Sequence, residues 1–241
     1  MSRIVLVHGS WHGAWCWHKV VSRLRAHGHE VIAPDLPSHG RDWTPAREVS
    51  LQDYADRLLT ILDASAEPSV VVAHSRAGIV LSTVAEQRPD LIHCAIYLAA
   101  VVALHGETVF DLLAHAGDSR LLPYFYQAED GSWDMLREEG YRDALYHDCS
   151  EDDIELSRLL LSPEPLRPSL TPMQLSAQNY GRVRKAYIEL SADRAVPLDW
   201  QRYMHRRETM SAVRSIDASH SAYFSKPDEL TRVIEELATN A

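Results

Sequence analysis

One short stretch, Ser69–Ala85, constrains the fold of this chain more than any other. Its first part, Val70–Ala73, is apolar and rich in β-branched residues, which predicts a strand buried on both faces. From Ala77 onward, small and apolar residues recur at helical spacing. Ser75 lies between these parts, where the chain must turn sharply. The stretch therefore predicts a strand–turn–helix junction that exposes a serine hydroxyl.

The residues around Ser75 read Ala-His-Ser-Arg-Ala and are followed by Gly78. A junction of this kind carries the nucleophile of α/β-hydrolases, where the usual pattern is Gly-x-Ser-x-Gly. Both flanking glycines are alanines here, Ala73 and Ala77. Alanine meets the physical requirement, because strand and helix pack closely and need only small side chains there. The alternative is a serine in an ordinary core turn, so the rest of the chain must decide.

The remainder of the chain alternates between apolar runs and helical patterns, which predicts a mostly parallel central sheet with helices on both faces. With 241 residues the chain can bury a sizeable core in one such fold. We expect the α/β class and an α/β-hydrolase fold, with the core formed by residues 1–102 and 179–241. The apolar runs predict further strands near residues 3–8, 30–36, 91–98, 185–190 and 213–216.

The alternation breaks in residues 103–178, which are more polar and richer in tyrosine and proline. Asp130-Gly131 lies between two aromatic segments and predicts a β-hairpin. An insertion between the sixth and seventh strands of such a sheet would form a lid over the carboxyl ends of the strands, where ligands bind. We therefore expect residues 103–178 to be a lid, or cap, inserted after the sixth strand. The alternative is that residues 103–178 form an insertion with a structural role only.

Two residues further along the chain lie where partners of Ser75 are needed. A serine hydroxyl is a good nucleophile only when a base takes its proton and a third group orients that base. In this fold the acid and then the histidine follow the serine, each after a strand. Asp193 follows the predicted strand at 185–190, and His220 follows the next one. The order therefore predicts a catalytic triad of Ser75, Asp193 and His220.

Other acids and histidines compete for these roles. Asp217 would still lie within the strand that precedes His220, and Asp199 is expected on a helix, so we prefer Asp193. The chain has 13 histidines, and His220 is distinguished by its position alone. We interpret four of the others as structural or pocket-lining, namely His8, His12, His18 and His74.

Acyl transfer also needs donors for the negative charge that develops on the substrate oxygen. The backbone N–H of Arg76 is one candidate for this oxyanion hole, because it begins the helix after Ser75. The other is the N–H of Ser10, in the loop after the first strand. The residues predicted to contact substrate, some of which could equally be plain core, are Gly9, Trp11, His74, Val101, Tyr124, Phe125 and Trp133.

Composition excludes several classes of partner. The net charge of −10 disfavours nucleic acids and anionic membranes, because both require a basic surface. The three cysteines lack paired or metal-type spacing, which favours a reducing compartment. The first apolar run is too short for a signal peptide, and no run approaches the roughly 18 residues of a membrane span. We expect a cytoplasmic protein with no cofactor or metal and a small-molecule ester substrate, and a homodimer is left open.

Nearly the whole chain resembles the plant methylesterase and hydroxynitrile lyase group of α/β-hydrolases, with its bacterial esterase relatives. Val5–Gly9 together with His12–Trp15 resembles the opening signature of the group. His27–Val31 followed by Asp35-Leu36 resembles its second strand. The predicted triad falls on the triad positions of the group. The cap resembles the group only loosely.

The resemblance implies an enzyme that cleaves a small, partly apolar carboxylic ester through an acyl-enzyme intermediate. Lyases of the group need a polar side chain where this chain has Gly9, and one branch needs a lysine where it has Ser221. His74 before the nucleophile is the pattern of the esterases. We therefore expect an esterase. The alternatives are a hydroxynitrile lyase-type carbon–carbon lyase on the same triad and a non-catalytic small-ligand receptor.

Arg76 replaces the apolar residue that is usual after the nucleophile in this group. We interpret it as a side chain at the start of a helix that points into solvent. The alternative is a cationic contact for an acidic or polar acyl group of the substrate. In that case, Arg76→Leu would selectively weaken substrates that carry a carboxylate.

Overall fold

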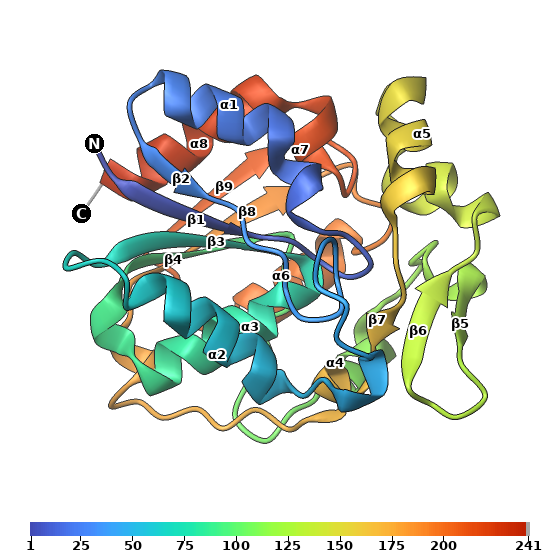
Figure 1. The fold of residues 1–241 in the computed structure, drawn as a ribbon, viewed down its shortest axis with the longest axis horizontal. Coiled ribbons are helices and arrows are strands. Elements are labelled where there is room, and N and C mark those ends of the chain that lie inside the picture. Colours follow the sequence, from blue (N-terminus) through green and yellow to red (C-terminus); the bar gives the residue numbers. More distant parts are fainter. Residues whose placement is uncertain (240–241) are drawn as a thin grey trace.

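The computed structural model describes residues 1–239, and its centre is a six-stranded sheet in which every neighbouring pair is parallel (Figure 1). The strand order is β2-β1-β3-β4-β8-β9. All the predicted strands are confirmed to within a few residues. Their bounds are β1 Arg3–Val7, β2 Glu30–Ile32, β3 Ser69–His74, β4 Ile92–Leu98, β8 Lys185–Leu190 and β9 Ala212–Ile216.

Helices cover both faces of this sheet, as the alternating pattern predicts (Figure 1). Leu6 and Val72 face the layer that contains α1 (His18–Ala26), α7 (Ala222–Ser225) and α8 (Pro227–Thr239). Their neighbours Val5 and Val71 face the opposite layer. Side chains of successive strand residues alternate between faces, so each strand contributes to both cores. The opposite layer contains α2 (Leu51–Leu62), α3 (Gly78–Gln87) and α6 (Leu198–His205).

Local signals fix where the helices begin and end. The side chain of Ser50 accepts a hydrogen bond from the Asp53 N–H, and the Asp53 side chain bonds the Ser50 N–H, so α2 begins with a capping box. Gly28 follows α1 with a φ of 87°, a left-handed conformation that favours glycine. Short 3₁₀ turns occur at Ala14–Trp17, Ala46–Glu48, Ser75–Ala77, Pro89–Leu91, Leu113–His115, Leu122–Tyr124, Arg167–Leu170 and Tyr180–Arg182.

A second, three-stranded antiparallel sheet of order β5-β6-β7 lies beside the main sheet, within residues 103–178 (Figure 1). The predicted hairpin at Asp130-Gly131 is confirmed, because β5 and β6 pair on either side of it. The helix α5 was not predicted. This segment contains α4 (Val109–Leu112), β5 (Phe125–Gln127), β6 (Trp133–Leu136), a π-helix at Tyr141–Leu145, α5 (Glu151–Leu160) and β7 (Glu164–Pro165).

The position of the cap segment differs from the expectation in one respect. It follows β4, the fourth strand of the described residues, rather than a sixth strand. The chain enters the parallel sheet directly at Arg3, so only four strands precede the cap. The last two residues of the predicted core range, 240 and 241, lie outside the described residues. Within residues 1–239, no helix combines the length and apolar character needed to cross a membrane.

Candidate active site

Ser75 lies at a sharp junction between β3 and the 3₁₀ turn that leads into α3. Its φ is 55°, in the left-handed region that non-glycine residues rarely adopt. The Ser75 carbonyl accepts a hydrogen bond of 2.9 Å from the Val101 N–H, which ties the junction to the chain after β4. Gly78 is needed beneath it, because a Cβ there would overlap the Val101 carbonyl oxygen. The junction is therefore strained and held from both sides.

Gly78→Ala is expected to destabilise the protein by about 3 kcal/mol, because the added methyl group meets backbone and cannot be relieved by a side-chain rotation. Urea unfolding followed by circular dichroism measures the change. Gly181→Ala is the matched control, since a Cβ there meets its nearest atoms at 3.5 Å, an ordinary contact. Equal stabilities of the two variants would contradict the packing described here.

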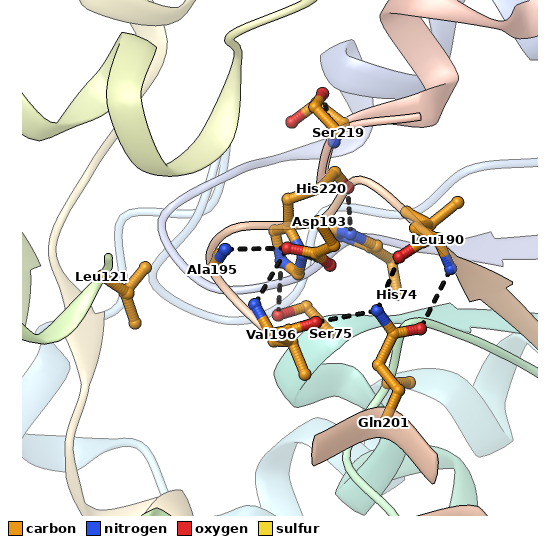
Figure 2. Close-up of polar contacts among 12 residues, drawn as sticks. His74, Ser75, Leu121, Leu190, Asp193, Ala195, Val196, Gln201, Ser219 and His220 are labelled. Carbon is orange, nitrogen blue, oxygen red and sulfur yellow. Dashed lines mark hydrogen bonds and ion pairs between the residues drawn. The ribbon is translucent and has the colours of Figure 1, made fainter. Parts of the chain in front are cut away.

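The structure brings Ser75, His220 and Asp193 together at the carboxyl ends of β3, β9 and β8 (Figure 2). The Ser75 hydroxyl lies 3.0 Å from His220 Nε2, and His220 Nδ1 lies 2.6 Å from Asp193 Oδ2. The side chains of His220 and Asp193 are 4% and 0% exposed. The competing Asp217 is exposed, and it accepts a hydrogen bond from the Ser191 hydroxyl instead of contacting His220. The arrangement can transfer a proton from the serine to the imidazole.

The loop that carries Asp193 is ordered by its own backbone and by a buried glutamine (Figure 2). Asp193 Oδ1 accepts hydrogen bonds from the N–H groups of Ala195 and Val196, at 2.8 and 2.9 Å. Gln201 on α6 accepts from the Leu190 N–H and donates to the Leu190 and Val196 carbonyls. Gln201 was not predicted, and its only signal in the sequence is a polar residue on the buried face of a helix.

Gln201→Leu is expected to destabilise the protein by about 3 kcal/mol, because it leaves buried backbone groups of Leu190 and Val196 without partners. The activity should also fall, since the same loop carries Asp193. Thermal unfolding and steady-state kinetics measure the two effects. Gln52→Leu on the exposed face of α2 is the control and should change stability by less than about 0.5 kcal/mol.

Two buried histidines hold the loop after β1. His8 Nδ1 donates to the Gly9 carbonyl, and His8 Nε2 accepts from the Leu36 N–H. His12 Nδ1 donates to the Ser10 carbonyl at 2.7 Å. Burial lowers the pKa of His8 to about 4 and that of His12 to about 3, so both rings are neutral near neutral pH. They therefore fix the peptides around Ser10 without adding charge.

His74 lies directly behind His220 (Figure 2). The two ring centroids are 4.4 Å apart, and His74 Nε2 donates to the His220 backbone carbonyl at 2.9 Å. Burial holds the pKa of His74 well below its usual value, and the charge of His220 acts in the same direction. A neutral His74 thus supports the backbone of the loop that carries His220.

A cavity of about 10 Å³ adjoins Ser75, which is room for about one water molecule. Two residues predicted to contact substrate, Trp11 and His74, line it together with Ser10, His12, Leu145 and His220. Leu145 had no signal in the sequence beyond residue type, whereas His12 lines the cavity in agreement with its interpretation as a structural or pocket-lining residue. Leu145, in the segment 103–178, thus forms part of the cavity wall.

The other predicted contact residues do not line this cavity. Gly9 and Val101 pack against the backbone of the junction at Ser75. Tyr124 and Phe125 pack against the core, and the Tyr124 ring fills the space beside Gly140. Trp133 lines a separate surface groove with Trp43 and Pro163. Contact between these cap residues and a substrate stays a prediction.

The expectation that Arg76 points into solvent is wrong. Its side chain is 12% exposed, and Nη1 donates to Asp134 Oδ2 on β6 at 2.7 Å. Burial raises the pKa of Asp134, and the positive charge of Arg76 opposes that shift. The error has a physical cause: β6 covers the start of α3, and the sequence did not indicate which part of the cap lies there. The guanidinium is therefore already paired with a carboxylate.

Metal and disulfide chemistry have no site in the described part of the chain. Residues 1–239 contain no group of three or more histidine, cysteine, aspartate or glutamate side chains arranged to hold a metal ion. Cys16, Cys94 and Cys149 are buried and unpaired. Burial also raises the pKa of the Cys149 thiol well above its usual range. Ser75 is thus the side chain around which the site is arranged.

Comparison with known proteins gives consistent matches. A model described as "Alpha/beta hydrolase family" matches residues 4–233. Methylesterase 9 of Arabidopsis thaliana is 32% identical over 252 residues, covering 99% of this chain and 98% of its own. Norfluorocurarine synthase 1 of Strychnos nux-vomica is 32% identical over 250 residues, covering 97% and 94%. The crystal structure of a pyrethroid hydrolase from Sphingobium faniae JZ-2 is similar with a TM-score of 0.89 and 26% identity, covering 99% of this chain and 98% of that one.

Proposed function

Because the chain belongs to the alpha/beta hydrolase family, in which it is similar to a plant methylesterase, we propose that it is a serine carboxylic-ester hydrolase. The observation that carries the proposal is the line of hydrogen bonds from Ser75 through His220 to Asp193. These three side chains come from loops far apart in the sequence and meet at one edge of the sheet. Such convergence is the geometric signature of nucleophilic catalysis by serine.

In the proposed mechanism His220 is the general base. Its Nδ1–H donates to Asp193, so Nε2 is free to take the Ser75 proton as the serine oxygen attacks the ester carbonyl. The protonated imidazole then gives this proton to the leaving alcohol, which leaves an acyl group on Ser75. Water attacks this acyl-enzyme while His220 again takes the proton. The acid product leaves, and the serine hydroxyl is restored.

The oxyanion of each tetrahedral intermediate is proposed to bind the N–H groups of Ser10 and Arg76. Within residues 1–239, neither N–H donates a hydrogen bond to another residue. Both N–H groups can therefore donate to a substrate oxygen, as an oxyanion hole requires. The Arg76 N–H also lies at the start of the 3₁₀ turn and α3, where the helix dipole favours negative charge. Loss of one such donor lowers kcat by about 10²- to 10³-fold in other hydrolases.

The proposed substrate is a small, partly apolar ester with an uncharged acyl group. Apart from the proposed base His220, the side chains that line the cavity at Ser75 are neutral, including His12 with its pKa of about 3. The neighbouring Arg76 is neutralised by Asp134, so it offers no free cation for a substrate carboxylate. Arg76→Leu should therefore weaken neutral and acidic esters alike, contrary to the selective effect that a substrate contact would give.

The alternatives fit the site less well. A polar side chain at position 9, as in the lyases, would place its Cβ 2.9 Å from Ser75 Cβ and 2.8 Å from His74 Nδ1. Accommodating it would require the junction at Ser75 to shift. A non-catalytic receptor needs no aligned triad. Neither alternative is favoured by a specific contact in this molecule.

The proposal is tested by a panel of esters that includes methyl esters of aromatic acids, with mandelonitrile cleavage as a parallel assay. We expect turnover of several neutral esters and no release of cyanide. Cyanide release without ester turnover would favour the lyase, and ligand binding without turnover would favour the receptor.

The proposed location is the cytoplasm, without nucleic-acid or membrane partners. The net charge of −10 and the free buried cysteines support this part of the proposal. Light scattering tests the homodimer.

A further inference from the structure

The cap sheet carries two carboxylates that lie opposite each other. Asp134 on β6 and Glu164 on β7 are cross-strand partners. Asp134 is 0% exposed and Glu164 is 3% exposed. Like charges at opposite positions of adjacent strands repel each other, and buried carboxylates are costly unless they are paired. This part of the cap is therefore stable only against a surface that supplies positive charge and hydrogen-bond donors.

The core supplies both at this place. Arg76 donates to both oxygens of Asp134, at 2.7 and 3.3 Å. His39 Nε2 lies 3.0 Å from Glu164 Oε2, and the Tyr54 hydroxyl donates to Glu164 Oε1 at 3.0 Å. Although burial raises it, the pKa of Glu164 is lowered to about 2 by the charge of His39. Two carboxylates of the cap thus meet one guanidinium, one hydroxyl and one imidazole of the core, and although burial lowers the pKa of that imidazole, the charge of Glu164 raises it.

Trp11 is bound to the cap through three of its polar atoms. Its N–H donates to Glu164 Oε2 at 3.2 Å, and its indole N–H donates to Asp134 Oδ1 at 2.9 Å. Its carbonyl accepts from the Ser162 N–H at 2.9 Å. The φ of Trp11 is 65°, a conformation that is costly for a bulky residue and needs such support. Because Trp11 follows Ser10, the cap also fixes the peptide beside the Ser10 N–H.

We propose that Asp134 and Glu164 are positioning residues through which the closed cap assembles the oxyanion hole. They hold Trp11 and Arg76, and these residues fix the two N–H donors proposed for the hole, those of Ser10 and Arg76. The proposal rests on the proposed ester hydrolysis. Neither carboxylate lines the cavity at Ser75, so their effect passes through the backbone.

The cavity beside Ser75 is too small for an ester, so the position of the cap controls access to the site. A cavity of about 10 Å³ beside Ser75 holds about one water molecule, and Leu145 of the cap forms part of its wall. An ester therefore reaches Ser75 only after the cap has moved. With the cap open, Trp11 and Arg76 lose their carboxylate partners and the donors are no longer held. Catalysis then requires that the contacts of Asp134 and Glu164 form again over the bound ester, with Leu145 displaced from the wall beside Ser75.

Asp134→Asn tests the proposal, because it removes the charge but keeps the side-chain shape. We expect kcat for a neutral p-nitrophenyl ester to fall about 10²-fold, with KM changing far less. A trifluoromethyl ketone that adds to Ser75 forms an oxyanion, so its Ki should rise by the factor by which kcat/KM falls. The corresponding alcohol forms no oxyanion and should bind as before. A merely structural role would weaken both ligands alike and would overturn the proposal.

A second measurement needs no catalysis. In the Ser75→Ala background, Asp134→Asn should speed amide hydrogen exchange in residues 9–12 at least about tenfold. Unchanged exchange would overturn the proposal, whatever the activity. Full activity of Ser75→Ala alone would instead overturn the proposed hydrolysis and leave the exchange result standing.

Two further variants guard against a folding defect. Trp11→Phe removes the indole N–H, which donates to the side chain and to the backbone carbonyl of Asp134, and should lower kcat about tenfold, with a parallel rise of the ketone Ki. Lys19→Met breaks another contact between core and cap, the 2.7 Å ion pair with Asp153. It should leave both quantities unchanged. An equal loss in Lys19→Met would show that any loosening of the cap suffices and would contradict the specific role of the two carboxylates.

Discussion

Ser75→Ala is expected to lower kcat for ester hydrolysis at least about 10⁴-fold and to leave the protein folded. Ser75 Oγ is the atom that lies 3.0 Å from the proposed base, and no other hydroxyl lines the cavity except that of Ser10 in the described structure. Alanine keeps the Cβ and so changes neither the packing nor the left-handed backbone of the junction. The measurement is the initial rate with p-nitrophenyl acetate.

A covalent probe gives an independent readout of the same substitution. A serine-directed fluorophosphonate should label the unsubstituted protein at Ser75 and should not label Ser75→Ala. Ser22→Ala on the exposed side of α1 is the control, and both its labelling and its turnover should match those of the unsubstituted protein. Full turnover by Ser75→Ala, or labelling at a different serine, would end the proposed mechanism.

The strands and the order of the candidate triad could be predicted because each depends on local sequence. An apolar run rich in β-branched residues, such as Val70–Ala73, favours a buried strand, and parallel strands bring their carboxyl ends to one edge. The residues that follow β3, β8 and β9 must therefore lie near one another. The sequence alone therefore predicts that Ser75, Asp193 and His220 lie together.

The contacts of the cap could not be predicted in the same way. Asp134 and Glu164 are acidic residues in a polar segment, and nothing local indicates that they are buried. Their burial depends on pairing between β6 and β7 and on docking against the core, both of which are tertiary events. The prediction that the Arg76 side chain points into solvent was wrong for the same reason. A charged residue at a helix start is usually solvated, unless another part of the chain covers it with an opposite charge.

Gln201 lies between these cases. A polar residue on the buried face of the helix after the acid is a local signal, but the role of Gln201 emerges only from its three hydrogen bonds to the backbone. It holds the strand end at Leu190 and the loop at Val196, on either side of Asp193. The acid is thereby presented to His220 by a rigid loop, and this rigidity gives a sharp prediction for the acid itself.

Asp193→Asn is expected to lower kcat about 10⁴-fold without loss of fold. Oδ1 of residue 193 accepts from two backbone N–H groups, so the amide oxygen of asparagine must take that place. Its NH₂ group then faces His220 Nδ1 and donates to it. The imidazole is thereby forced to carry its proton on Nε2, where it can no longer accept the proton of Ser75. Steady-state kinetics measure the loss, and thermal unfolding checks the fold.

Asp217→Asn is the matched control, because Asp217 is exposed, lies three residues before His220 and bonds only Ser191 in the described structure. It should keep kcat within about twofold, as surface substitutions usually have small effects. If Asp217→Asn were inactive and Asp193→Asn active, the acid would have been assigned to the wrong loop. If both stayed active, His220 would need no carboxylate, and the buried 2.6 Å contact with Asp193 would have no part in the reaction.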